Sequence, residues 1–486
     1  MTAPRAIIAA AFIIAAAIPA ATAADQPDPD ELRGQLREAS IEGDHAAAAR
    51  AARRLIEQQP DNPAHRYALA ASLAATGDIR EAERALDAAL DRGFTRFFDL
   101  ERDPRLNPLK LTETYRLAVE NRAALLDSAA EQAAAAFQRD FPGARYAIRR
   151  DHHRRVITIA DLPELELGHA QTQLERVAGF ADHHFPQWSN TDPDRPHAWA
   201  ILILPGERHA RKLFRGRTDA AGLFNPNTRQ LITRDLGPAL RHELLHALHW
   251  RHMEQLGQLH PIWIREGLAA LPERLDPEQP NATLPNHRAN IVRARAERNA
   301  LTPWTQLFDL DHRRFHQSYA RTYYAECRAV MRFLESKGRL AEWYRRYTQT
   351  YADDPTGAAA IEATFDAPIA EIEERFRAFA AGLPNIPTPA DPPTATLGLD
   401  LAPGRGAGPL VATPGGRRGT GGPNDSTDRL RLNDAITAIN NTPTPTVHEL
   451  ILALAQHEPG DRVTLSLRRG DTPHTVTLEL IARDTR

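Results

Sequence analysis

The five residues His242-Glu243-Leu-Leu-His246 restrict the fold of this chain more than any other stretch. Two histidines four positions apart lie on one side of an α-helix, about 40° apart around its axis and one turn apart along it. The opposite side of the same helix is apolar, because it carries four leucines, Leu240, Leu244, Leu245 and Leu248. We therefore expect a helix that begins near Pro238, buries its leucines and offers both histidines to one metal ion.

Histidine and carboxylate side chains are the ligands available to such an ion, because Cys327 is the single cysteine of the chain. One cysteine also excludes an intrachain disulfide. Zinc binds imidazole nitrogens at about 2.0–2.1 Å, and its catalytic sites use three protein ligands and leave a position for water. Glu243 stands where a carboxylate can take a proton from that water. The motif is short enough to arise by chance, so a third ligand is needed to support a site.

A candidate third ligand follows in the segment Trp263-Ile-Arg-Glu266-Gly-Leu-Ala-Ala270, after a turn at His260-Pro261. Together the two segments resemble the gluzincin metallopeptidases, in which a His-Glu-x-x-His helix precedes a helix with a ligand glutamate in a Trp-x-x-Glu-Gly-Leu-Ala-like motif. The resemblance covers about residues 115–383. It implies that His242, His246 and Glu266 bind one Zn²⁺ per chain and that Glu243 is the general base and proton shuttle.

Two further side chains are weaker candidates for this site. The run from Tyr324 to Leu334 is similar to the helix that follows the ligand glutamate in gluzincins, which implies that Tyr324 faces the cleft and donates to an oxyanion. Tyr319 and Tyr323 remain rivals for that role. His249 lies on the metal side of its predicted helix, and we expect it to support the site or face solvent rather than bind the ion.

The middle of the chain, residues 104–383, is expected to form an α+β zincin-like domain. β-Branched and apolar runs predict strands at 155–159 and 198–204, and a turn at Asn225-Pro-Asn predicts a hairpin over 222–234. The second strand of that hairpin, near 231–233, is predicted to be the sheet edge that aligns a substrate. Long helices are expected at 113–141 and 168–185.

The first residues of the chain predict export. Arg5 precedes an apolar run over 6–18, and Ala21-Thr-Ala23 supplies the small residues that a signal peptidase reads. The run is shorter than the roughly 20 apolar residues of a membrane span. We expect a signal peptide over residues 1–23 and a mature, periplasmic chain without a membrane span.

Residues 28–103 carry an internal repeat, because Gly43-Asp44 recurs as Gly77-Asp78, displaced by 34 positions. That period is typical of tetratricopeptide helix pairs. The segment resembles a short tetratricopeptide array, which implies a docking surface for a protein partner. Two generic alanine-rich helical hairpins remain the alternative.

A proline-rich linker at 384–393 separates the middle region from residues 394–486. The last segment resembles a PDZ domain of the bacterial protease type, a small mainly-β fold. The resemblance implies that Leu397, Gly398 and Leu399 form the loop that holds a peptide carboxylate, and that an extended peptide joins a sheet edge beside a helix at 447–456. A PDZ fold used for packing alone remains the alternative.

The expected architecture is therefore multidomain: all-α tetratricopeptide-like hairpins, an α+β zincin-like metallopeptidase domain and a mainly-β PDZ domain. A formal net charge of −3 gives no field of one sign, so nucleic acid is a poor candidate partner. The gluzincin resemblance implies hydrolysis of a protein or peptide substrate, by an endopeptidase in preference to an aminopeptidase. Two alternatives stay open, namely a non-catalytic envelope scaffold or peptide-binding assembly factor, and a zinc-dependent hydrolase of another bond.

Overall fold

The computed structural model describes residues 28–483 with the exception of 143–145, 190, 191, 193, 215–221, 227, 318, 389–392, 403, 405–407, 414–429 and 471. The signal peptide expected at 1–23 and part of the expected linker at 384–393 lie outside the described residues. Among the described residues, no helix has the length and apolar character needed to cross a membrane.

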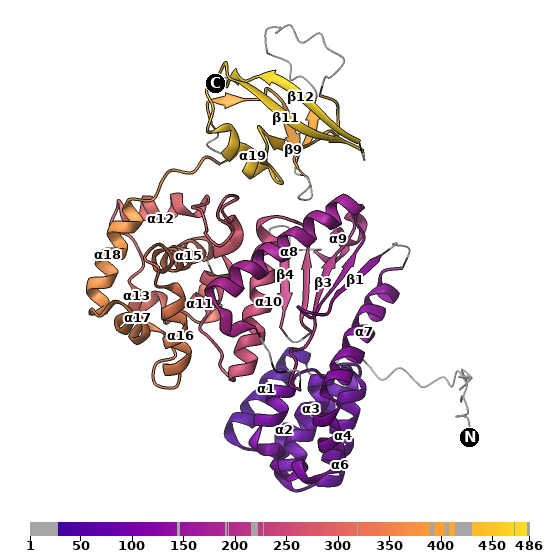
Figure 1. Cartoon of the computed structure of the whole chain (residues 1–486). Coiled ribbons are helices and arrows are strands. Elements are labelled where there is room, and N and C mark those ends of the chain that lie inside the picture. The colour runs from indigo at the N-terminus through magenta and orange to yellow at the C-terminus, as the bar shows by residue number, and fades with distance from the viewer. Residues whose placement is uncertain are drawn as a thin grey trace. The chain divides into compact units, whose positions relative to one another are not determined.

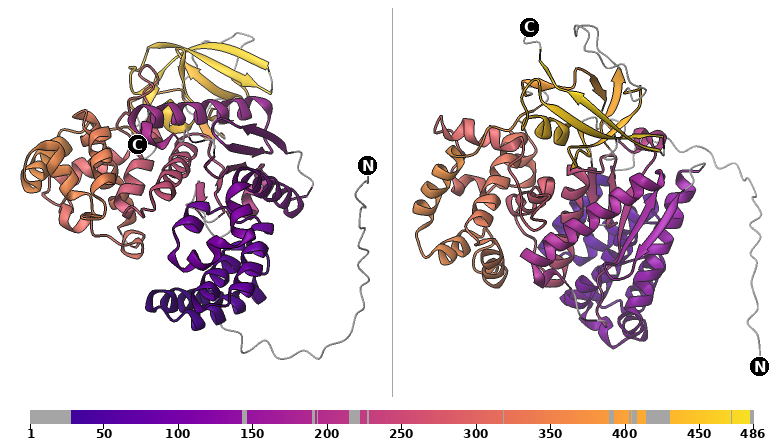
Figure 2. Two further views of the ribbon diagram at one scale, coloured as in Figure 1. Left: turned by 60° about the horizontal axis from the view of Figure 1, so that its bottom comes forward. Right: turned by 45° about the horizontal axis from the view of Figure 1, so that its top comes forward.

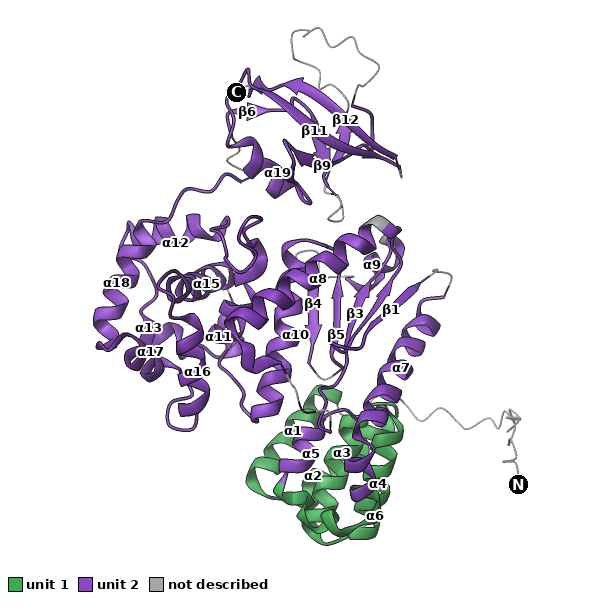
Figure 3. Ribbon diagram, viewed as in Figure 1, with its two compact units in different colours: residues 1–92, 104–115 green, residues 93–103, 116–486 purple. Residues whose placement is uncertain are grey.

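The chain divides into two compact units, which Figure 3 distinguishes by colour. Unit 1 comprises residues 1–92 and 104–115, and unit 2 comprises residues 93–103 and 116–486.

Unit 1 is built from paired helices. Its repeated Gly-Asp pairs explain the pairing: Gly43 and Gly77 end one helix in the left-handed region, at φ 75° and 88°, and the next residue begins the following helix. The Asp44 carboxylate accepts a hydrogen bond from Ala47 N at 2.8 Å, and Asp78 caps its own helix in the same way. The elements are α1 (Pro29–Glu42), α2 (His45–Gln58), α3 (Pro63–Thr76), α4 (Ile79–Asp91) and η1 (Pro104–Leu111).

The first part of unit 2 contains a five-stranded sheet in the order β1-β2-β3-β5-β4. Strands β2, β3 and β5 run parallel, and the two outer strands are antiparallel to their neighbours. The prediction that 231–233 forms the sheet edge was wrong, because β5 pairs with both β3 and β4 and so places β4 at the end of the order. The strands are β1 (Ala147–Asp151), β2 (Val156–Ala160), β3 (Ala200–Leu204), β4 (Gly222–Asn225) and β5 (Gln230–Thr233).

Helices cover both faces of this sheet (Figure 1). On one face α7 (Arg122–Asp140) packs its alanines and Phe137 against the isoleucines of β2 and β3. On the other face α8 (Glu164–His184) and α10 (Pro238–Leu256) share the main apolar core of the unit. The helix predicted over 113–141 is two helices, because it is interrupted at Asn121, whose side-chain amide donates to Leu117 O at 2.9 Å.

Helix α10 ends at Gly257, which adopts φ 69°. The Arg102 guanidinium donates to the last carbonyls of α10, those of Glu254 and Gln255, and so satisfies acceptors that the helix itself leaves open. The helices that follow gather beside α10, and Figure 2 shows this group from two further directions. They include α11 (Ile262–Ala269), η3 (Leu271–Arg274), α12 (Arg288–Ala296), α13 (Trp304–Leu307), α14 (His312–Phe315), α15 (Ala320–Ser336), α16 (Leu340–Thr350), α17 (Ala358–Phe365) and α18 (Ile369–Ala381).

The C-terminal part of unit 2 is a β-rich domain with its own apolar core. Its main sheet has the order β12-β11-β9-β8-β7, with β10 beside β9, and a short pair joins β13 to β6. Near the C-terminus, β11 and β12 pair antiparallel over their whole length. The elements are β6 (Ala395–Thr396), β7 (Asp400–Ala402), β8 (Leu410–Thr413), β9 (Ala435–Ile439), β10 (Thr442–Pro443), α19 (Val447–Leu454), β11 (Arg462–Arg469), β12 (Thr472–Glu479) and β13 (Ile481–Ala482).

Candidate metal centre

The structure brings the side chains of His242, His246 and Glu266 together. Their potential ligand atoms all lie within 4.8 Å of one another. The Nε2 atoms of the two histidines are 3.1 Å apart, and Glu266 Oε2 lies 3.2 Å from His246 Nε2 and 3.4 Å from His242 Nε2. Two imidazole nitrogens and one carboxylate oxygen form a donor set that suits Zn²⁺.

The position of Glu266 depends on the close packing of α11 against α15. A Cβ atom added to Gly267 would lie 2.9 Å from the backbone oxygen of Cys327. Any side chain at residue 267 would therefore push α11 away from α15 and move the neighbouring Glu266. The Glu-Gly pair in the sequence is explained by this contact. Cys327 itself is buried in the core.

A second carboxylate, that of Glu273, orients the first histidine. Glu273 Oε1 lies 3.1 Å from His242 Nδ1. Because a carboxylate only accepts, Nδ1 carries a proton and donates to Glu273. In the neutral ring Nε2 then holds the lone pair that would bind a cation. Glu273 is fixed in turn by Asn286 at 2.7 Å and by Arg288, which donates to both carboxylate oxygens at 2.8 Å.

Sequence reasoning missed Glu273, Asn286 and Arg288. They lie in the 3₁₀ turn η3, in the loop after it and at the start of α12, where no helical period relates them to the histidines. One signal in the sequence could have pointed to Glu273: it follows Glu266 by seven positions, a spacing that corresponds to two helical turns.

Electrostatics at the centre favour a bound cation. Burial by itself would raise the pKa of Glu266, but His246 and His242 hold it well below its usual range. Burial would likewise lower the pKa of His242, whereas hydrogen bonds with Glu266 and Glu273 raise it to about 10. The two buried carboxylates thus supply negative charge that a cation between the imidazoles would offset.

Glu243 differs from Glu266 and Glu273 because no hydrogen bond within the described part of the chain fixes its carboxylate. Its carboxylate makes no hydrogen bond to any residue that the structure describes. Strand β4 passes beside it, since a Cβ atom added to Gly222 would lie 2.8 Å from Glu243 Cγ. Burial raises the pKa of Glu243 above its usual value, against the lowering effect of His242 and His246. A free carboxylate with a raised pKa suits a group that accepts and returns a proton.

Of the three tyrosines considered from the sequence, Tyr324 lies at the centre. Its ring is 6.3 Å from that of His242, and the Arg288 guanidinium lies 5.2 Å from its centroid. Burial, together with the charges of Glu266 and Glu243, raises the pKa of Tyr324 well above its usual value, so the hydroxyl stays protonated and can donate. Tyr319 is 64% exposed, and Tyr323 packs against Phe315.

His249 lies away from the three ligand atoms. It is buried, its Nε2 atom is 2.8 Å from His260 Nδ1, and Trp188 stacks on its ring at 5.0 Å. Burial holds the pKa of His249 well below its usual range. His249 therefore lies in a buried cluster of aromatic rings with Trp188, His260 and Tyr344, and the solvent-facing alternative was wrong.

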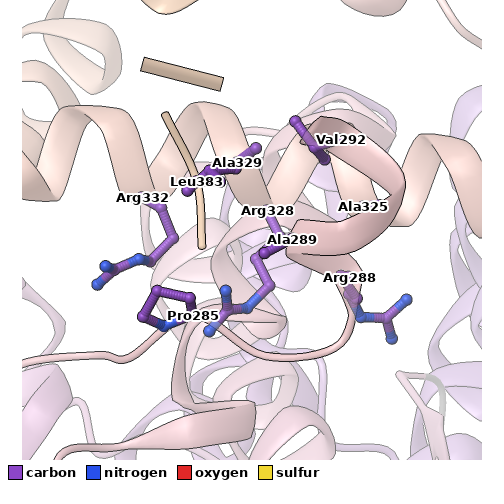
Figure 4. Close-up of a pocket in the computed structure, with 9 residues that line it drawn as sticks. All are labelled: Pro285, Arg288, Ala289, Val292, Ala325, Arg328, Ala329, Arg332 and Leu383. Atoms are coloured by element: carbon purple, nitrogen blue, oxygen red, sulfur yellow. The ribbon is translucent and has the colours of Figure 1, made fainter. Parts of the chain in front are cut away.

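A small pocket lies between α12 and α15, lined in part by Arg288, Arg328 and Arg332 (Figure 4). These guanidinium groups are engaged with the loop around Glu273. Arg328 donates to the carbonyls of Ala270 and Leu284 at 2.7 and 2.8 Å, and Arg332 donates to that of Thr283. The arginines of the pocket thus hold in place the segment that carries Glu273.

In the C-terminal domain, the predicted loop of Leu397, Gly398 and Leu399 immediately precedes β7, the last strand of its sheet order. Gly398 adopts φ 69°, a left-handed conformation that favours glycine, and a Cβ atom there would require the Ile481 side chain to shift. The Gly398 N–H donates to Thr396 Oγ1 at 3.3 Å.

Comparison with known proteins identifies two modules. Residues 39–96 match the tetratricopeptide repeat family, and residues 419–480 match the PDZ domain family. Both are protein- or peptide-interaction modules. No curated protein matches the chain. A crystal structure of an aminopeptidase N family protein from Idiomarina loihiensis aligns with 70% of this chain and 67% of that chain, at 13% identity and a TM-score of 0.28, which is too low to support an inference about fold or activity.

Proposed function

We propose that this chain is an exported, zinc-dependent metallopeptidase that hydrolyses peptide bonds in a protein or peptide substrate in the periplasm. One observation carries the proposal: His242, His246 and Glu266 offer three ligand atoms within 4.8 Å, and the unpaired carboxylate of Glu243 stands beside them. Metal-dependent hydrolysis needs that combination of three protein ligands and a free base. We assign one Zn²⁺ per chain to the site.

Each residue of the centre has a separate task. Zn²⁺, when bound, supplies a Lewis acid that polarises the scissile carbonyl and acidifies water. Glu243 accepts a proton from the attacking water and returns it to the leaving amine. Tyr324 donates its hydroxyl proton in a hydrogen bond to the oxyanion. Glu273 and Arg288 keep the His242 ring in the orientation that directs Nε2 inward.

The substrate is proposed to align along β4. This strand ends the sheet order, and its Gly222 lies beside Glu243, so an extended peptide could add to the sheet in front of the base. An edge that accepts extended backbone on both sides of the scissile bond favours an endopeptidase over an aminopeptidase.

The flanking modules are proposed to deliver proteins to this centre. The PDZ domain would hold a C-terminal peptide at residues 397–399 and along β7, and the tetratricopeptide repeats would bind a protein partner. The two matched modules also favour a second candidate function, a non-catalytic envelope scaffold or peptide-binding assembly factor. The presence of Glu243 together with all three ligand side chains argues for catalysis.

The proposal is tested by zinc analysis and casein hydrolysis on the mature wild type and on Glu243→Gln. Arg345→Gln serves as the control, because Arg345 is an exposed residue of α16 whose side chain, among the residues that the structure describes, donates to Gln349 alone. We expect one zinc per chain in all three proteins and cleavage in the wild type and the control alone. Wild type without zinc, or cleavage that persists in Glu243→Gln, would refute the proposal. Zinc without any cleavage would favour the scaffold.

A further inference from the structure

One cationic side chain beside the candidate ligands has no task in the hydrolysis described above. Arg265 directly precedes Glu266 on α11, and its side chain is half-buried. Its Nε atom is enclosed without a hydrogen-bond partner. Across the part of the chain that the structure describes, its guanidinium group takes part in no hydrogen bond or ion pair.

Three neighbouring arginines, in contrast, make hydrogen bonds. Arg288 is paired with Glu273, Arg328 donates to Ala270 and Leu284, and Arg241 donates to Pro272 O at 2.7 Å. A half-buried guanidinium without a partner lowers stability, because it loses hydration and gains no hydrogen bond in exchange. Such a group is expected where a ligand completes its hydrogen bonds.

Arg265 lies close to Glu266 and Tyr324, and its charge also contributes, after burial, to the lowered pKa of His249 and of His260. Burial lowers the pKa of Arg265, while the nearby carboxylate of Glu266 acts in the opposite direction. Its charge also contributes to the lowered pKa of His316, after burial and His312. The ring of Tyr324 lies 6.1 Å from that of His316 and 6.3 Å from that of His242, so Tyr324 lies near both histidines.

The two terminal nitrogens of the Arg265 guanidinium group have the geometry that binds a carboxylate. Only Nε is enclosed, which leaves Nη1 and Nη2 to present two parallel donors. A guanidinium fork matches the two oxygens of a carboxylate, and charge on both partners strengthens these hydrogen bonds.

We propose that Arg265 is a specificity-determining residue that binds a carboxylate of the peptide substrate within about two residues (~7 Å) of the scissile bond. This inference rests on the proposed function, since it assumes a peptide in the cleft. The carboxylate belongs either to an aspartate or glutamate side chain or to the C-terminus of a substrate that is cut near its end. Both sources have the same chemistry at Arg265.

The test measures binding rather than turnover. Zinc-loaded Glu243→Gln is titrated with fluorescent hexapeptides of alanine, leucine and phenylalanine, acetylated and amidated, in which glutamate or glutamine replaces each position in turn. The host peptide is also used as the free acid. Each titration is repeated in Glu243→Gln backgrounds that carry Arg265→Gln, Arg265→Met or the control Arg345→Gln. Zinc content and melting temperature verify that each protein is folded.

We expect one position at which the glutamate peptide, or the free acid, binds about tenfold or more tightly than its neutral partner. That ratio should fall to near one in both Arg265 variants and stay unchanged in the Arg345 control, while the neutral peptide binds equally to all. Arg265→Met retains the apolar stem and serves if Arg265→Gln does not fold. A preference for the free acid alone would assign the carboxylate to the C-terminus.

A ratio that survives the loss of Arg265, the absence of any acidic preference, or the absence of peptide binding would overturn the inference. The proposed hydrolysis is judged separately. Acidic preference in Glu243→Gln without cleavage by the wild type would leave the Arg265 site standing and remove the peptidase. Cleavage by the wild type without an acidic preference in Glu243→Gln would support the peptidase and remove the Arg265 site.

Discussion

Replacing Glu273 by glutamine should weaken zinc binding without removing a ligand. The carboxylate accepts from His242 Nδ1 at 3.1 Å, from Asn286 at 2.7 Å and twice from Arg288 at 2.8 Å. An amide of the same shape turns one acceptor into a donor, which then faces a donor of Arg288 or His242.

The magnitude follows from the lost contacts. A hydrogen bond to a charged group contributes about 1.5–3 kcal/mol, so losing the one that orients His242 should raise the dissociation constant for zinc by roughly 10–100-fold. Breaking the buried pair with Arg288 should also lower the free energy of unfolding by about 3 kcal/mol. That is the low end of the usual range, because 20% of the Arg288 side chain is exposed.

Glu326→Gln is the matched control. Glu326 is also a buried carboxylate paired with an arginine, Arg295 at 2.8 Å, but it has no contact with the candidate ligands. Zinc affinity is measured by competition with a chromophoric chelator, and stability by urea unfolding of the zinc-free proteins. We expect both variants to lose stability and only Glu273→Gln to lose affinity. Equal zinc affinities in the two variants would refute the role assigned to Glu273.

Three further changes test other parts of the structure. Gly222→Ala should lower kcat about tenfold or more with zinc retained, because its Cβ would lie 2.8 Å from the Cγ atom of the general base, Glu243. Gly168→Ala is the control, because a Cβ atom there would have no atom within 4 Å. Equal kcat values in the two variants would contradict the contact between Gly222 and Glu243. Gly267→Ala should cost about 1–3 kcal/mol of unfolding free energy, since α11 must move from α15; an unchanged urea midpoint would count against it. Burial lowers the pKa of His252 to about 4 and that of His260 to about 3, whereas histidine in the unfolded chain has a pKa of about 6.5. The free energy of unfolding is therefore at its full value above pH 6.5 and decreases as the pH falls toward the folded-state pKa values, because the unfolded chain binds protons first. Urea unfolding should show a loss of about 1 kcal/mol per histidine between pH 6.5 and 5.5, and a flat profile would exclude the buried neutral state.

Much of the centre could be predicted from the sequence, because helix periodicity is a local property. The spacing of His242 and His246 and the Gly-Asp pairs of the repeats each act within a few residues. The structure places the two histidines on α10, as expected, and the Gly-Asp pairs at helix ends. The approach of Glu266 to the histidines depends on a tertiary contact, that of Gly267 with Cys327, which resemblance to a family suggested and residue spacing did not.

The errors have a common physical origin. A hairpin sequence predicts that β4 and β5 pair but not which of them joins β3, so the edge strand was misassigned. The contact between Glu273 and His242 spans 31 positions and depends on how η3 and α12 pack, which no local pattern encodes. Sequence likewise favoured Tyr324 but left Tyr319 and Tyr323 as rivals, and packing of α15 against the centre separated Tyr324 from them.

The most direct test of a zinc centre at this site is anomalous X-ray diffraction at the zinc absorption edge, from crystals of the zinc-loaded Glu243→Gln protein. The account predicts one anomalous peak per chain, within about 2.0–2.2 Å of His242 Nε2, His246 Nε2 and a carboxylate oxygen of Glu266. A chain without a peak, or a peak on other residues, would contradict it.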